Sequence, residues 1–94
     1  MPYITKEEKH YFDADIELML RLIKTPGQLN YIFTKLLHGY INSNELRYKT
    51  INEAIGVLEC CKLELYRRIA APYEDSCIMK NGDVNDVNFE NKKA

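Results

Sequence analysis

Apolar residues recur at intervals of three and four positions along three stretches of this chain. Such spacing places the apolar side chains on one face of an α-helix, because the helix completes a turn every 3.6 residues. The pattern predicts helices over residues 6–24, 29–42 and 50–71. We therefore expect an all-α fold with two shorter helices and one long C-terminal helix of about 33 Å.

Capping signals indicate where two of these helices begin. Thr5 and Glu8 have the spacing of a capping box, in which each side chain bonds to the backbone of the other residue. They predict that the first helix begins near Lys6. Thr50 and Glu53 repeat this spacing ahead of the third stretch, so we expect a second capping box there.

Two prolines and a change in composition indicate where helical order ends. The pair Pro26-Gly27 is expected to stop the first helix, and Pro72 is expected to stop the third. Residues 74–94 contain five acidic and three basic side chains and few apolar ones. We expect a helical domain over residues 1–73, followed by a mostly mobile, acidic and Asn-rich tail over residues 74–94.

A chain of 94 residues forms one small domain at most, and such a domain usually needs additional stabilisation. Its three cysteines include an adjacent helical pair, Cys60 and Cys61, which does not suit a disulfide framework. There is no CxxC or HxxxH spacing, so no metal site is expected. Self-association remains, and the long third helix has more apolar surface than two shorter helices can cover.

Several classes of function are disfavoured by composition. The net charge of −1 argues against binding to long nucleic acids by phosphate neutralisation. No apolar run approaches the roughly 20 residues that span a bilayer, so no membrane segment is expected. The chain has no nucleophile elbow, phosphate-binding Gly-rich loop or carboxylate pair flanked by His. We therefore expect neither catalytic residues nor a cofactor.

The sequence features that remain suit a small anionic ligand. The segment Lys24–Gln28 precedes a predicted helix N-terminus, where backbone N–H groups can bind an anion, although it could equally be an ordinary turn. The pair Arg67-Arg68 offers bidentate contacts to phosphate, or simply complements the dipole at a helix C-terminus. The chain has seven tyrosines, whose rings suit base stacking, although Tyr31, Tyr40 and Tyr66 could equally be half-buried helix residues.

Much of the chain resembles a known phage family. The resemblance lies in RYKTINEAIGVLEC (47–60), LELYRR (63–68) and APYED (71–75), and also in residues 1–4, 27–31 and 81–84. These segments are similar to those of the phage anti-CBASS sponges (anti-CBASS protein two). The resemblance implies a non-enzymatic helical protein that assembles as a homohexamer. In the cytoplasm of the infected bacterial host it would sequester cyclic di- and trinucleotide messengers without degrading them.

The resemblance also assigns ligand-binding residues. Tyr11 matches a tyrosine that stacks on a base of the cyclic dinucleotide. Pro26 stands where the family has a lysine before the second helix, and Lys24 is the nearest lysine. Asn30 is a further candidate for a polar contact to the dinucleotide.

For the cyclic trinucleotide, the resemblance points to a second pair of residues. Arg67 matches an arginine that contacts the phosphates. Gln28 stands where the family has a hydroxyl residue. An alternative function is a phage adaptor that binds a host protein through the apolar surface of the third helix.

Overall fold

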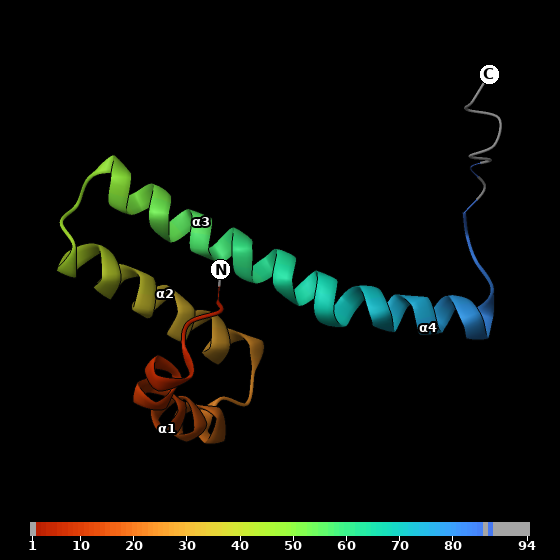
Figure 1. Ribbon diagram of the computed structural model, residues 1–94, viewed down its shortest axis with the longest axis horizontal. Helices are drawn as coiled ribbons and strands as arrows, with labels where there is room; N and C mark the ends of the chain where they lie inside the picture. Colours follow the sequence, from red (N-terminus) through yellow and green to blue (C-terminus); the bar gives the residue numbers. More distant parts are fainter. Residues whose placement is uncertain (1, 86, 88–94) are drawn as a thin grey trace. The chain divides into compact units, whose positions relative to one another are not determined.

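The computed structural model describes residues 2–85 and residue 87. Every regular element in that part of the chain is helical and no strand occurs there, which confirms the all-α class. The chain divides into two units, residues 1–61 and residues 62–94, and each is described by itself. In chain order the elements of Figure 1 are α1 (Lys6–Leu22), α2 (Pro26–Ser43), α3 (Tyr48–Leu65), the π-helical turn η1 (Tyr66–Ala70) and α4 (Ala71–Asn81).

Helix α1 begins at the predicted residue. Thr5 has an extended backbone, and its Oγ1 accepts a hydrogen bond from the Glu8 N–H at 3.2 Å, so Thr5 is the N-cap. The helix ends at Leu22, two residues before the predicted end. It ends there because Ile23 adopts an extended conformation (φ −79°, ψ 116°) while its N–H still bonds to the carbonyl of Met19.

Helix α2 begins at Pro26, three residues before the predicted start. Pro26 occupies the first turn of the helix, where its missing N–H removes no intrahelical bond. Thr25 is the N-cap and has an extended backbone (φ −129°, ψ 156°). Its side chain bonds to the backbone of Gln28, and the Gln28 side chain bonds back to the backbone of Thr25. This capping box fixes the start of α2, and sequence reasoning missed it.

The predicted capping box of Thr50 and Glu53 is wrong. Helix α3 begins at Tyr48, so Thr50 lies inside the helix, where it is 2% exposed. The Thr50 hydroxyl instead donates a hydrogen bond to the carbonyl oxygen of Asn44 at 3.2 Å. A short polar side chain can bond to a nearby carbonyl in this way when the connecting loop is short, and here it joins α3 to the C-cap of α2.

The first unit has a very small buried core. Among the described residues only Thr50 and Ala54 are buried. A cavity of about 220 Å³ is lined by apolar side chains of α2 and α3, among them Leu37 and Leu58. The apolar stripe predicted for α1 consists of Phe12, Ile16, Met19, Leu20 and Ile23. Phe12, Ile16 and Leu20 are each at least half exposed, whereas Met19 and Ile23 are partly buried. A single chain therefore leaves open much of the apolar surface that the sequence pattern assigns to a core.

In the second unit the predicted end of the long helix at residue 71 is wrong. The Ala71 N–H bonds to the carbonyl of Tyr66, five residues earlier, and α4 then continues to Asn81. Pro72 has no N–H for the usual bond to the Arg68 carbonyl, and its ring crowds that carbonyl. A wider π turn immediately before proline relieves this crowding without ending the helix.

The predicted boundary between domain and tail therefore falls inside a helix. Residues 74–81, which we expected to belong to a mostly mobile tail, form most of α4. The helix ends at Gly82, whose positive φ of 91° is easily adopted by glycine, and whose N–H bonds to the Ile78 carbonyl at 2.8 Å. Residue 86 and residues 88–94 of the predicted tail lie outside the described residues.

Candidate functional site

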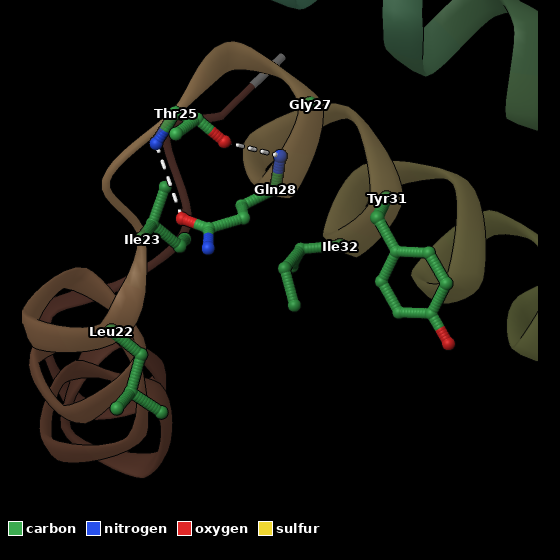
Figure 2. A pocket seen from close by; sticks show the side chains of 7 residues that line it. All are labelled: Leu22, Ile23, Thr25, Gly27, Gln28, Tyr31 and Ile32. Carbon is green, nitrogen blue, oxygen red and sulfur yellow. Dashed lines mark hydrogen bonds between the residues drawn. The ribbon is translucent and has the colours of Figure 1, made fainter.

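The largest cavity described in the first unit lies beside the turn between α1 and α2. It is a shallow recess of about 500 Å³ that is largely open to solvent. Figure 2 shows its lining, which comes from the end of α1, the turn and the first two turns of α2: Leu22, Ile23, Thr25, Gly27, Gln28, Tyr31 and Ile32. The size falls within the range of pockets that hold small organic ligands.

Hydrogen bonds within the turn hold this cavity wall in place. The Gln28 N–H donates to Thr25 Oγ1 at 3.2 Å. In return, Gln28 Oε1 accepts from the Lys24 N–H at 2.6 Å and from the Thr25 N–H at 3.1 Å. The Gln28 side chain is thus anchored to the backbone on the N-terminal side of the turn, as Figure 2 shows for its bond with Thr25.

The same bonds change the expected anion site at the N-terminus of α2. Pro26 has no N–H, and the Gln28 N–H is taken by Thr25 Oγ1. The Leu29 N–H bonds to the Thr25 carbonyl at 3.1 Å. Gly27 is then the remaining first-turn residue whose N–H could meet an anion. The turn therefore offers much less to a phosphate through its backbone than an uncapped helix terminus would.

The cavity instead combines apolar walls with a few polar groups. Ile23 and Ile32 supply aliphatic surface, and Figure 2 shows the Gln28 amide nitrogen pointing into the space between them. Tyr31 forms the far side with its ring and directs its hydroxyl away from the turn. Such a surface suits a flat ring that is stacked on one side and hydrogen-bonded at its edge.

Three residues assigned from the resemblance lie in this turn. Lys24, Pro26 and Gln28 follow one another closely, but of these only Gln28 lines the cavity. Asn30 lies on α2 outside the lining, and its Oδ1 accepts a hydrogen bond from the Thr34 hydroxyl at 3.3 Å. The structure therefore brings Lys24, Pro26 and Gln28 into one turn, with Asn30 just beyond it.

Tyr11 lies apart from the cavity in its own chain. It is 79% exposed on α1, eleven residues before Leu22 at the cavity wall. This separation corresponds to about 16 Å along the helix axis. Tyr11 is thus available to a ligand, but it does not share the cavity with Gln28 within one chain.

Arg67 belongs to the second unit and lies in η1. One guanidinium nitrogen is 3.2 Å from both carboxylate oxygens of Glu64, and the Arg67 side chain is mostly exposed. In the same segment, Tyr66 is hydrogen-bonded to Glu74, and this bond together with the charges of Glu74 and Asp75 raises the pKa of the phenol above its ordinary value of 10.0. An open recess of about 410 Å³ beside η1 is lined by Lys62, Leu63, Leu65, Tyr66 and Ala70.

Sequence reasoning missed Thr25 and undervalued Tyr31. Thr25 and Gln28 have the T-x-x-Q spacing of a capping box, which would have identified the turn as a defined element. Tyr31 was open to interpretation as a half-buried helix residue, yet it is 61% exposed and lines the cavity. Its position three residues after Gln28, on the same side of α2, is the signal that could have linked the two.

Other kinds of site are not found in the part of the chain that is described. No three His, Cys, Asp or Glu side chains there are arranged to hold a metal ion. None of the helices described there combines the length and apolar character needed to cross a membrane.

A family model with the description domain of unknown function (DUF6899) matches residues 1–84 of the 94-residue chain. No curated protein and no solved structure matches the chain.

Proposed function

The chain belongs to the DUF6899 family, and we propose that it binds cyclic oligonucleotide second messengers and sequesters them without degrading them. The observation that carries this proposal is the cavity of about 500 Å³ beside the α1–α2 turn. It presents an exposed tyrosine ring and an anchored amide to one open space. Stacking of one base on such a ring contributes roughly 1–3 kcal/mol.

The resemblance to the phage anti-CBASS sponges supports the choice of ligand class. It covers most of residues 1–84 and includes the segment 27–31, which contributes Gly27, Gln28 and Tyr31 to the cavity. On this proposal the protein acts in the cytoplasm of the infected bacterial host, where it lowers the free concentration of the messenger. Binding alone is sufficient for this effect, so no catalytic group is required.

Assembly into a homo-oligomer, a hexamer by the same resemblance, is part of the proposal. Phe12, Ile16 and Leu20 on the apolar stripe of α1 are exposed in a single chain, and contact with another copy would bury them. The cavity is largely open to solvent, so a neighbouring chain could also complete it. Tyr11 would then act on a ligand in a neighbouring chain's cavity, because it lies about 16 Å from the wall of its own.

We also propose that Arg67 contacts the phosphates of cyclic trinucleotides. Glu64 lies 3.2 Å away in an ion pair in which the Arg67 side chain is 65% exposed and the Glu64 side chain is 21% exposed. Ion pairs near the surface typically contribute only about 0–1 kcal/mol to stability. A charge-assisted bond to phosphate contributes perhaps 1.5–3 kcal/mol, so exchange of carboxylate for phosphate would be favourable.

Titration calorimetry of the full chain with a panel of cyclic di- and trinucleotides tests the proposal. We expect saturable heat with at least one of them and recovery of the intact ligand after heat denaturation of the protein. No heat at tens of micromolar protein would overturn ligand binding. Recovery of a cleaved ligand would overturn sequestration in favour of hydrolysis.

A second candidate function is that of an adaptor for a host protein. The observation that favours it is the apolar surface of α3, where Ile55 and Val57 are each more than half exposed. This function would be favoured if the nucleotide-free chain captured one host protein in stoichiometric amounts and the Ile55→Asp variant did not. Capture that is unaffected by Ile55→Asp would count against it.

A further inference from the structure

The second unit carries a row of exposed apolar side chains. Residues 62–81 form one unbroken helix through the end of α3, η1 and α4 (Figure 1), and no other regular element occurs among the described residues of this unit. On this helix Leu65, Ile69 and Tyr73 are 59%, 62% and 70% exposed. In proteins most helical stability comes from packing of an apolar face against another element. We call these three residues the apolar row and ask what covers it.

The π turn keeps the apolar row straight. Its members are spaced by four positions, and in an ordinary α-helix each such step turns the side chain by about 40° around the axis. In η1 the Ala71 N–H bonds to the Tyr66 carbonyl, five residues earlier, so this turn contains more residues than an α-helical turn. The additional residue offsets most of the drift. The apolar row therefore follows one side of the helix for two turns.

Side chains of opposite charge lie along one flank of the apolar row. Lys62 and Tyr66 are one helical turn apart, and both line the recess of about 410 Å³ beside η1, to which Leu65 of the row also contributes. Tyr66 is in turn hydrogen-bonded to Glu74. Lys62, Tyr66 and Glu74 therefore share one flank. Its cation lies toward the N-terminal end of the helix and its anion toward the C-terminal end.

This flank is complementary to a reversed copy of itself. In a two-fold pair the same surface of both chains meets. If two such helices cross antiparallel at Ile69, Leu65 lies opposite the partner's Tyr73. Lys62 then lies within about 3 Å, along the helix axis, of the partner's Glu74, because the two positions are almost equally far from Ile69. A parallel pair would instead bring like charges together at both positions.

We infer that the apolar row is an interface between two antiparallel copies of this chain. The charges on its flank favour a second copy over an unrelated partner, since one pairing places both Lys62 and Glu74 opposite a complementary charge and two-fold symmetry repeats it. The inference rests on the assembly that forms part of the proposed function. It adds to that assembly a surface outside α1, and it requires no ligand.

The first test is the self-association of the full chain without nucleotide, measured by sedimentation equilibrium at low ionic strength. Ile69→Asp places a charge at the centre of the apolar row and should raise the dissociation constant by at least about tenfold. Met79→Asp is the matched control. Met79 is 88% exposed on the same helix, but it lies six positions after Tyr73 and therefore on another side. This variant should associate as wild type does.

The second test exchanges the charges and does not depend on how well one variant folds. Lys62→Glu and Glu74→Lys each place like charges opposite each other in both symmetry-related contacts, so each variant alone should associate about tenfold more weakly than wild type. In an equimolar mixture of the two variants, each contact again joins opposite charges. Association of the mixture should therefore return close to that of wild type. Effects within one chain, such as loss of the bond between Tyr66 and Glu74, persist in the mixture and cannot produce this recovery.

The outcomes separate the inference from the proposed function. If wild type associates and Ile69→Asp behaves as Met79→Asp does, the apolar row is not the interface. If the mixture of charge variants does not recover, the pairing is not antiparallel. Either result overturns the inference and leaves assembly through α1 and ligand binding standing. A wild-type chain that stays monomeric would overturn the inference together with the proposed assembly, whereas calorimetry with cyclic nucleotides would still decide ligand binding.

Discussion

The two helical prolines of this chain, Pro26 and Pro72, occupy similar places and have opposite effects. Each lies in the first turn of a helix, α2 or α4. Before Pro26 the backbone of Thr25 is extended, and a new helix begins behind a side-chain cap. Before Pro72 the backbone of Ala71 is helical (φ −63°, ψ −49°), and the helix continues through a π turn.

The residues that precede each proline account for this difference. A residue before proline avoids the helical conformation unless its surroundings enforce it. Thr25 has a hydroxyl that accepts the Gln28 N–H, which stabilises the extended conformation and the break. Neither Ala70 nor Ala71 has a side chain that could cap a helix, and alanine has the highest helix propensity. The break at Pro26 creates the concave turn that holds the cavity, whereas the second unit keeps a continuous helical backbone there.

The largest expected effect on stability comes from replacing Pro72 with alanine, and Pro26→Ala is the matched comparison. Pro72→Ala restores the N–H that can bond to the Arg68 carbonyl, so η1 should relax to an ordinary α-helical turn. We expect the free energy of unfolding to rise by about 1–3 kcal/mol. Pro26→Ala should change it by less than about 0.5 kcal/mol, because proline is well accommodated at the first helical position. Denaturant unfolding at one fixed protein concentration measures both changes.

These two variants test whether the two prolines differ in their effect on stability. Equal effects on stability would mean that the π turn relieves nothing and that the local backbone does not distinguish the prolines. A fall in stability for Pro72→Ala would contradict the interpretation of η1 as an accommodation to proline. The protein concentration is held constant because association of the chain would make its apparent stability depend on concentration.

We expect the α1–α2 cavity and the η1 segment to bind different ligands. Tyr31→Ala removes the exposed ring from the cavity and should weaken binding of the cyclic dinucleotide by about 5- to 150-fold, the range for loss of one stacked base. Arg67→Ala should weaken binding of the cyclic trinucleotide and leave the dinucleotide affinity unchanged. Titration calorimetry of both variants with both ligands measures this. If either variant weakens the two ligands equally, the two regions do not form separate sites.

The sequence predicts more of the helices than of the site, for a physical reason. Helical periodicity reports which face is apolar, and it predicted α1, α2 and α3 to within three residues at their starts. It contains no information on whether a side chain bonds to its own backbone or to a neighbouring helix. Thr50 has the spacing of an N-cap, but its hydroxyl donates to the Asn44 carbonyl. Thr25 is an N-cap, and only its spacing from Gln28 could have revealed it. The cavity depends on that local bond, and therefore it was not predicted.

Loss of the cap is a smaller change that tests whether the turn depends on it. Thr25→Ala removes the acceptor of the Gln28 N–H and should lower the free energy of unfolding by about 1 kcal/mol. Thr25→Ser retains the hydroxyl and should behave as wild type. In a small domain, 1 kcal/mol corresponds to roughly 4–8 °C in Tm. If thermal unfolding of Thr25→Ala and Thr25→Ser coincides, the hydroxyl does not determine the break at Pro26.

The smallest expected effect concerns the bond between Tyr66 and Glu74, on either side of Pro72. This bond and the charges of Glu74 and Asp75 raise the pKa of the Tyr66 phenol above 10.0 in the folded chain, and unfolding returns it to that ordinary value. The folded state therefore favours the protonated phenol. The resulting stability is fully present below about pH 10 and is lost as the pH rises through the raised pKa. Tyr66→Phe removes this contribution. Stability measured between about pH 9 and 12 should consequently fall more steeply for wild type than for Tyr66→Phe. Parallel curves of stability against pH for the two proteins would show that the Tyr66–Glu74 bond does not stabilise the folded chain. The continuity of η1 and α4 would then depend on the backbone alone.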